Sequence, residues 1–345
     1  MKTIKTALAK LIIAASSTLS GSYWEYPPWC LPFAARGSYQ IQALDIAFTC
    51  PRRPERTLQA RIWYPISKHQ SRLPLILYSH YLTGWRTAPP FICEHLASHG
   101  FVTATVEHED SYPDWPVLID RPLDILALLN WLTVDREWYS KLAFDRIGIA
   151  GYSMGGTTAL MLGGARINPL YYLDWCGQPQ PSTEEGRDMK RFAEWWDQLA
   201  AYRAAFGPTE ETLWTSFTDS RITAVLAMAP WGAPLFGEAG INGIQLPTCI
   251  IGGTNDKNAV YERDQVFVFN HLTSSESTLV SIQDAGHKMV YAPGIQDVLN
   301  HYATAFFSYH LHRKRKVYRE VAEPSPLARV ISRSKTDEHS ANEML

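Results

Sequence analysis

The chain has little of three things that would point to other classes of protein. No run of about 18 apolar residues occurs, which excludes an obvious membrane-spanning helix. Its 5 cysteines among 345 residues are too few, and odd in number, for a disulfide-rich scaffold. A net charge of −2 implies no broad attraction to nucleic acid. With 46% hydrophobic residues and no internal repeat, the chain can bury one large core.

The cysteines and the N-terminus bear on the cellular compartment. Cys93 and Cys249 lie in apolar patterns and are predicted to be buried thiols. Cys30 and Cys50 are the pair to consider for a disulfide, provided that the protein is exported. Residues 1–22 read either as a signal peptide or as a disordered leader. We therefore expect a secreted or periplasmic protein, with a cytoplasmic location as the alternative.

Short β-rich runs alternate with helical patterns along the chain. This alternation predicts an α/β fold, a mostly parallel eight-stranded sheet flanked by helices, in one domain over residues 37–320. The C-terminal residues 323–345 are rich in Pro, Ser and charge and are predicted to be disordered. The predicted strands are Tyr39–Cys50, Thr57–Ile66, Leu75–Ser79, Phe101–Glu107, Arg146–Ala150, Ile222–Met228, Thr248–Gly252 and Thr278–Ile282.

Residues 166–221 are too long for a plain connection and predict a helical insertion after the helix that follows the strand Arg146–Ala150. Its apolar residues recur at helical spacing. Two interpretations stay open: an amphipathic helix lying on the core, or a cap beside the active site.

The most informative motif is the G-x-S-x-G pattern from Gly151 to Gly155, centred on Ser153. It stands between a short buried strand and a helix, as a nucleophile elbow requires. Such a serine needs a base, and the base needs an orienting acid, in the chain order Ser, acid, His. Asp256 follows a later strand and is the predicted acid, with Asp284 as its nearest competitor.

His287 lies in the loop after the next strand and is the predicted base, whereas His271 and His301 fall in helical patterns. An oxyanion requires two backbone donors. The first is the N–H of the residue after the nucleophile, Met154. The second comes from the loop that starts at His80 to Leu82.

These motifs resemble the α/β-hydrolase superfamily, in its dienelactone-hydrolase-like branch. That branch includes platelet-activating-factor acetylhydrolases and bacterial polyester hydrolases such as cutinases. The resemblance covers roughly residues 37–309. The matching segments are Ser79–Gly84, Leu96–Phe101, Gly151–Gly156, Ala229–Trp231, Asn255–Asp256 and Gly286–His287.

The resemblance implies that Ser153 is the nucleophile, Asp256 the acid and His287 the base. It also implies that the N–H groups of Leu82 and Met154 form the oxyanion hole. Trp231 would line the acyl site. Tyr81 stands where the family usually has glycine, and we expect it to contact substrate. True dienelactone hydrolases use cysteine, so Ser153 argues against that reaction.

The sequence thus predicts a serine esterase that acts on a small-molecule, lipid or polyester ester. It needs neither metal nor cofactor, and we expect no nucleic-acid partner. A serine peptidase or acyltransferase with the same triad is the alternative enzyme. A non-catalytic binding protein on a hydrolase fold is the alternative from another class.

Overall fold

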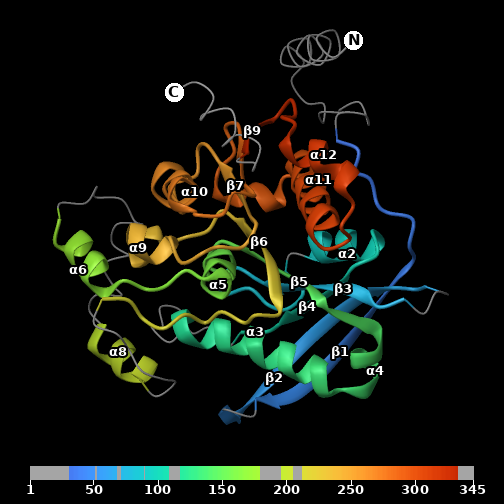
Figure 1. Cartoon of the computed structure of the whole chain (residues 1–345), viewed down its shortest axis with the longest axis horizontal. Helices are drawn as coiled ribbons and strands as arrows, with labels where there is room; N and C mark the ends of the chain where they lie inside the picture. Colours follow the sequence, from blue (N-terminus) through green and yellow to red (C-terminus); the bar gives the residue numbers. More distant parts are fainter. Residues whose placement is uncertain are drawn as a thin grey trace.

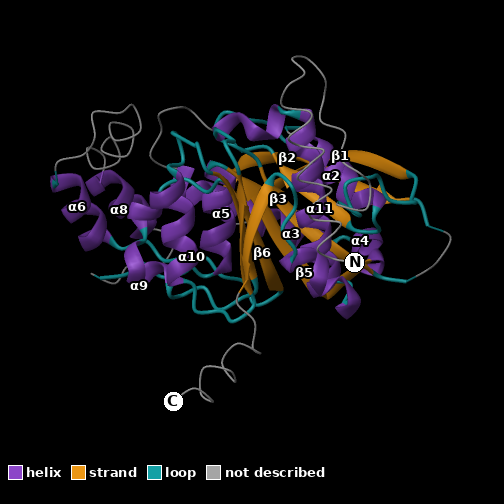
Figure 2. Ribbon diagram, turned by 90° about the horizontal axis from the view of Figure 1, so that it is seen from above, coloured by secondary structure: helices purple, strands orange, loops and turns teal. Residues whose placement is uncertain are grey.

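The computed structural model describes residues 31–50, 53–67, 71–88, 90–108, 117–178, 196–204 and 212–332. These residues form a nine-stranded sheet in the order β1-β2-β4-β3-β5-β6-β7-β8-β9. Helices cover both sides of it (Figure 1, Figure 2). The strands are β1 (Ile41–Cys50), β2 (Arg53–Pro65), β3 (Leu73–Ser79), β4 (Val102–Val106), β5 (Leu142–Tyr152), β6 (Ile222–Met228), β7 (Thr248–Gly253), β8 (Ser277–Ile282) and β9 (Ala328–Ser332).

Neighbouring strands from β4 through β8 in this order pair in parallel. The pairs β1–β2, β2–β4 and β8–β9 are antiparallel. The α/β-hydrolase fold is therefore confirmed, with the functional loops expected at the carboxyl ends of the parallel strands. The helices are α2 (Pro90–Ser98), α3 (Val117–Val134), α4 (Arg136–Lys141), α5 (Met154–Gly163), α6 (Pro169–Gly177), α8 (Trp196–Ala204), α9 (Gly237–Ile241), α10 (Phe267–His271), α11 (Pro293–His310) and α12 (Tyr318–Ala322).

Alternation along the central strands explains why both faces are covered. In β3, Leu75 and Leu77 point into one hydrophobic cluster with α3 and α5. Ile76 and Tyr78 point into the other cluster, with α2 and α11. Two buried faces require near-continuous apolar strands, as the sequence shows here.

The sheet has one strand more than predicted, because β9 lies in the segment that we expected to be disordered. Ala328 is 2% exposed and Val330 and Ser332 are half-buried, whereas Arg329 and Ile331 between them are exposed. It pairs with β8 and thereby covers a sheet edge that would otherwise expose unpaired backbone groups. The prediction of disorder from residue 323 was therefore wrong for Ala328–Ser332, while residues 333–345 lie outside the described residues.

The insertion contributes α6 and α8, which lie side by side at one end of the molecule (Figure 1). Leu199 of α8 is fully buried, and the ring of Trp196 lies 5.3 Å from those of Tyr172 and Trp214. The described part of α8 thus packs on the core. The predicted leader and Cys30 are outside the described residues, and Cys50, Cys93 and Cys249 are buried free thiols.

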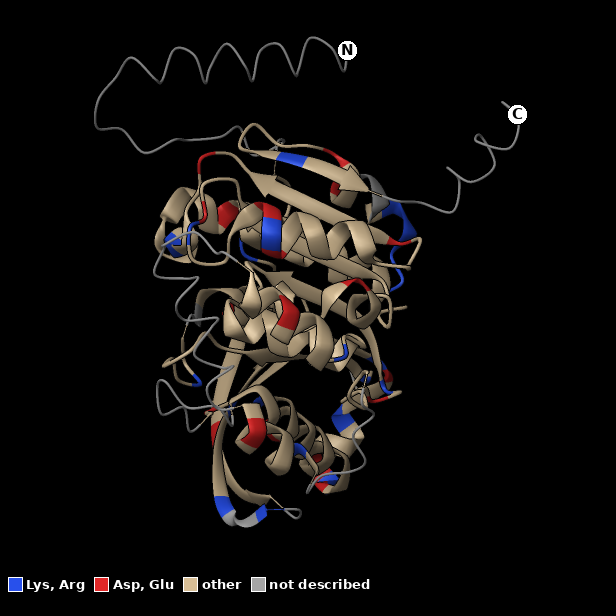
Figure 3. Cartoon of the chain, turned by 90° about the vertical axis from the view of Figure 1, so that its left-hand side faces the viewer, with Lys and Arg blue, Asp and Glu red and all other residues tan. Residues whose placement is uncertain are grey.

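Charged residues are scattered over the described elements, with basic and acidic positions interspersed (Figure 3). In the part of the chain that the structure describes, no helix is both long enough and apolar enough to cross a bilayer.

Candidate active site

Ser153 lies in a strained turn between β5 and α5. Its φ of 57° and ψ of −122° belong to a region that non-glycine residues rarely adopt. A Cβ on Gly151 would lie 2.0 Å from the carbonyl oxygen of Gly155. A Cβ on Gly155 would lie 2.0 Å from that of Ser79. Glycine is therefore required at both positions for the turn to pack against β3 and its own helix.

The structure brings the three predicted catalytic residues into one hydrogen-bonded series. Ser153 Oγ lies 2.9 Å from His287 Nε2, and His287 Nδ1 lies 2.8 Å from Asp256 Oδ2. The three residues follow β5, β8 and β7, so they meet at the carboxyl edge of the sheet. Such an arrangement allows the imidazole to accept the serine proton while the carboxylate holds the ring.

The carboxylate of Asp256 is buried and held on both sides. Its Oδ1 accepts hydrogen bonds from the backbone N–H groups of Asn258 at 2.9 Å and Ala259 at 3.0 Å. Its Oδ2 faces His287. Because both oxygens are engaged, the carboxylate orientation is fixed before any substrate binds.

Tyr152 adds a second contact to His287. The two rings stack with centroids 5.4 Å apart, and the Tyr152 hydroxyl donates to the backbone carbonyl of His287. Burial raises the pKa of the Tyr152 hydroxyl, and the nearby Asp256 raises it further. The hydroxyl thus stays protonated and available as a donor at neutral pH.

The competing candidates lie elsewhere. Asp284 is exposed in the turn before His287. His271 faces Glu238, 3.4 Å away, and His301 accepts a hydrogen bond from the N–H of Phe33. None of these described contacts involves Ser153.

The predicted oxyanion loop, His80 to Leu82, follows β3 and lies against the nucleophile turn. The carbonyl oxygens of Ser79 and His80 would lie 2.0 Å and 2.6 Å from a Cβ on Gly155. The Tyr81 ring meets Tyr152 edge to face, with centroids 6.0 Å apart, and also contacts Tyr291. Tyr81 therefore stands beside the tyrosine that stacks on His287.

Met154 is the first residue of α5, where backbone N–H groups have no partner within the helix. Trp231 lies just after β6, at the same edge of the sheet as Ser153. Its backbone N–H donates to Thr157 Oγ1 at 3.1 Å, which ties it to α5. Its side chain is half-buried and touches both hydrophobic clusters.

Sequence reasoning missed a buried charged cluster behind the oxyanion loop. Arg53 donates to Asp124 at 2.6 Å and to Asp120 at 2.8 Å, and His108 Nδ1 lies 3.0 Å from Asp124 Oδ2. Burial alone would lower the pKa of Arg53, but these two aspartates raise it, so the guanidinium stays charged. One feature of the sequence could have revealed this cluster. The charged residues Asp120, Arg121 and Asp124 lie in an otherwise mostly apolar helix.

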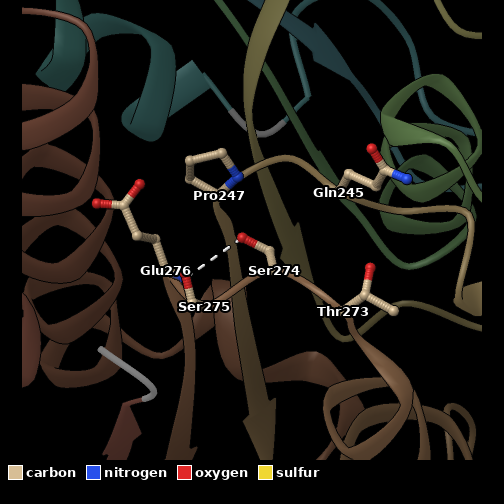
Figure 4. Close-up of a pocket in the computed structure, with 6 residues that line it drawn as sticks. All are labelled: Gln245, Pro247, Thr273, Ser274, Ser275 and Glu276. Carbon is tan, nitrogen blue, oxygen red and sulfur yellow. Dashed lines mark hydrogen bonds between the residues drawn. The ribbon is translucent and has the colours of Figure 1, made fainter. Parts of the chain in front are cut away.

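A cavity of about 430 Å³ lies elsewhere (Figure 4). It borders the starts of β7 and β8, whereas Ser153 follows the carboxyl end of β5. Its position on the amino side of the sheet separates it from the three hydrogen-bonded residues. Its lining residues are Gln245, Pro247, Thr273, Ser274, Ser275 and Glu276. Within the described ranges, no three His, Cys, Asp or Glu side chains are grouped so that they could hold a metal ion.

Comparison with known families supports the resemblance. The family model described as platelet-activating factor acetylhydrolase, isoform II, matches residues 46–127. The match spans β2, β3, β4 and the oxyanion loop, and it ends before Ser153. It confirms the predicted resemblance and indicates a hydrolase of the lipase and esterase type. A search of curated proteins found no match.

Proposed function

We propose that this protein is a serine hydrolase that cleaves carboxylic esters through an acyl-enzyme intermediate. The observation that carries the proposal is the unbroken series from Ser153 Oγ through His287 to the buried Asp256. A serine hydroxyl is a weak nucleophile on its own, and a base in hydrogen-bond contact activates it. The strained φ of Ser153 supports the same role, because strain of this kind clusters at functional sites.

In the proposed reaction, Ser153 Oγ attacks the ester carbonyl while its proton passes to His287 Nε2. Asp256 keeps the proton of His287 on Nδ1 and stabilises the imidazolium that forms. The carbonyl oxygen becomes negative, and the N–H groups of Leu82 and Met154 donate to it. The C–O bond then breaks, and His287 returns the proton to the leaving alcohol.

Water completes the cycle. It attacks the acyl-enzyme, His287 accepts a proton from it, and the tetrahedral intermediate collapses to release the acid and restore Ser153 Oγ–H. These steps require no metal and no organic cofactor. The substrate that we propose is a small-molecule or lipid ester, and the match to an esterase-type family supports it.

Tyr81 and Trp231 are the residues that we propose to contact the substrate. Each extends from the end of a central strand, and Trp231 is tied through Thr157 to the nucleophile helix. The matched family is described as an acetylhydrolase, which supports a short acyl group in the substrate. The aromatic surface at Tyr81, with the exposed Tyr291 beside it, suits an apolar leaving group.

The decisive experiment measures hydrolysis of p-nitrophenyl esters of increasing acyl length, with Ser153→Ala as the control. A fluorophosphonate should label Ser153 and leave the variant unlabelled. A peptide p-nitroanilide added to the panel would be cleaved if the protein is a peptidase, and an added alcohol would receive the acyl group if it is an acyltransferase. A binding protein would show neither turnover nor labelling.

A further inference from the structure

Arg121 of α3 is fully buried and holds the oxyanion loop by its backbone. Its Nη1 donates to the carbonyl of His80 at 2.6 Å, and its Nη2 donates to the carbonyl of Tyr81 at 3.0 Å. Nη1 also lies 3.3 Å from Ser79 Oγ. One planar guanidinium thus holds two successive carbonyl groups. The ammonium group of a lysine lacks this forked arrangement of donors.

Holding the Tyr81 carbonyl also aims the N–H of Leu82. The two groups belong to one planar trans peptide, so they point in opposite directions. The same carbonyl accepts from the N–H of Gly84 at 3.0 Å and lies 2.8 Å from His80 Nδ1. With its oxygen held on the buried side, the peptide presents the Leu82 N–H on the side away from Arg121.

The loop needs such support because it is strained and tightly packed. Thr83, next to Leu82, has a φ of 59°. A non-glycine residue in this region persists where the surroundings hold it. The loop also packs so closely on Gly155 that no Cβ fits there. A small rotation of the Tyr81–Leu82 peptide would therefore move the donor relative to Ser153.

The residues behind the loop form a rigid base. Ser79 Oγ lies 3.0 Å from His108 Nε2, His108 Nδ1 lies 3.0 Å from Asp124, and the N–H of His108 donates to His80 Nε2 at 3.2 Å. Ser79, His108 and Asp124 repeat the residue types of a catalytic triad. Each is at most 4% exposed, so they have no access to substrate and act as structural support.

We propose that Arg121 is a positioning residue for the oxyanion hole, which it serves by fixing the Tyr81–Leu82 peptide through two backbone carbonyls. This inference rests on the proposed esterase function. It assigns Arg121 an effect on the transition state, because the oxyanion forms only after Ser153 has attacked.

The first test is Arg121→Met, which keeps much of the side-chain length and removes both donors. We expect kcat for p-nitrophenyl acetate to fall about 10²-fold with KM little changed, the order of loss that removing one oxyanion donor causes. A trifluoromethyl ketone forms a tetrahedral oxyanion with serine. Its inhibition constant should rise by the same factor as kcat/KM falls.

Arg166→Met is the matched control. Arg166 also donates to two successive carbonyls, those of Trp214 at 2.7 Å and Leu213 at 3.1 Å, but at the start of the insertion. This variant should lower the melting temperature and keep kcat for the acetate ester. Equal kcat losses in the two variants would show a general structural effect and overturn the proposal.

Arg121→Lys keeps the charge and decides the question if Arg121→Met does not fold. With one nitrogen in place of two, we expect a folded protein whose kcat falls about tenfold. Full activity in Arg121→Lys, or kcat within about threefold of wild type in folded Arg121→Met, would overturn the positioning role. Failure of the proposed function itself is distinguishable, since it would appear as an absence of ester hydrolysis in the wild-type protein or as retained activity in Ser153→Ala.

Discussion

The stability of this protein should fall steeply in mild acid because four histidines, two buried and two half-buried, are kept neutral in the folded state. Burial lowers the pKa of His95, His301, His310 and His312 from the ordinary 6.5 to about 4. In the unfolded chain these groups regain a pKa of about 6.5. Between these two values the unfolded state binds more protons than the folded state, so acid favours unfolding.

The magnitude follows from the two pKa values. Going from about pH 7 to about pH 5, one such histidine lowers the free energy of unfolding by about 2 kcal/mol. Four of them acting independently would remove about 7 kcal/mol, which is comparable with the total stability of a typical domain, about 5–15 kcal/mol. The loss begins near pH 6.5 and is complete near pH 4, where the folded-state groups also protonate.

His310→Phe isolates one of these groups. His310 lies on α11, its ring 4.6 Å from that of Phe306, and burial accounts for its lowered pKa. Urea unfolding at about pH 7 and about pH 5 should show that the variant loses about 2 kcal/mol less than wild type over this interval. The neighbouring Tyr309→Phe changes no group that titrates there, so its effect should be the same at both pH values. An unchanged pH dependence in folded His310→Phe would refute the reasoning.

Three substitutions test the active site. Ser153→Ala should lower turnover of p-nitrophenyl acetate by about four to six orders of magnitude, and activity above about a tenth of wild type would contradict the assignment. Asp256→Asn should lower kcat about 10⁴-fold because His287 then adopts the wrong tautomer. Trp231→Ala should lower kcat/KM for long-chain or aromatic esters with little change in melting temperature. A stability loss of about 3–5 kcal/mol with unchanged ester preference would place Trp231 in the core instead.

Local patterns predicted the parts of the fold that local chemistry determines. Short apolar runs predicted the central strands β3, β4, β6, β7 and β8, because strands buried on both faces leave little room for polar residues. The glycines around Ser153 made the turn recognisable in the sequence, because the turn leaves no space for a Cβ at Gly151 or Gly155. Chain order then selected Asp256 and His287, and the structure places both in contact distance of their expected neighbours.

β9 was missed because its stability comes from a distant partner. Ala328–Ser332 is a five-residue alternating segment within a Pro-, Ser- and charge-rich tail, and composition alone favours disorder there. Pairing with β8 supplies the backbone hydrogen bonds, and Ala328 and Val330 face the core. A short edge strand of this kind is specified by the sheet that it covers rather than by its own sequence.

The buried charged cluster behind the oxyanion loop could not be predicted from the sequence, for a related reason. Each of its bonds joins segments that are distant in the chain, from β2 to α3 and from α3 to the loop after β3. An arginine in an apolar helix is a visible anomaly, since arginine is rarely buried without partners. Its partners, however, include backbone carbonyls, which every residue carries and no side-chain motif reveals. A hydrogen-bonded series of side chains such as Ser153, His287 and Asp256 can therefore be predicted from sequence. Groups that hold the backbone of a loop in place become apparent only when the fold is known.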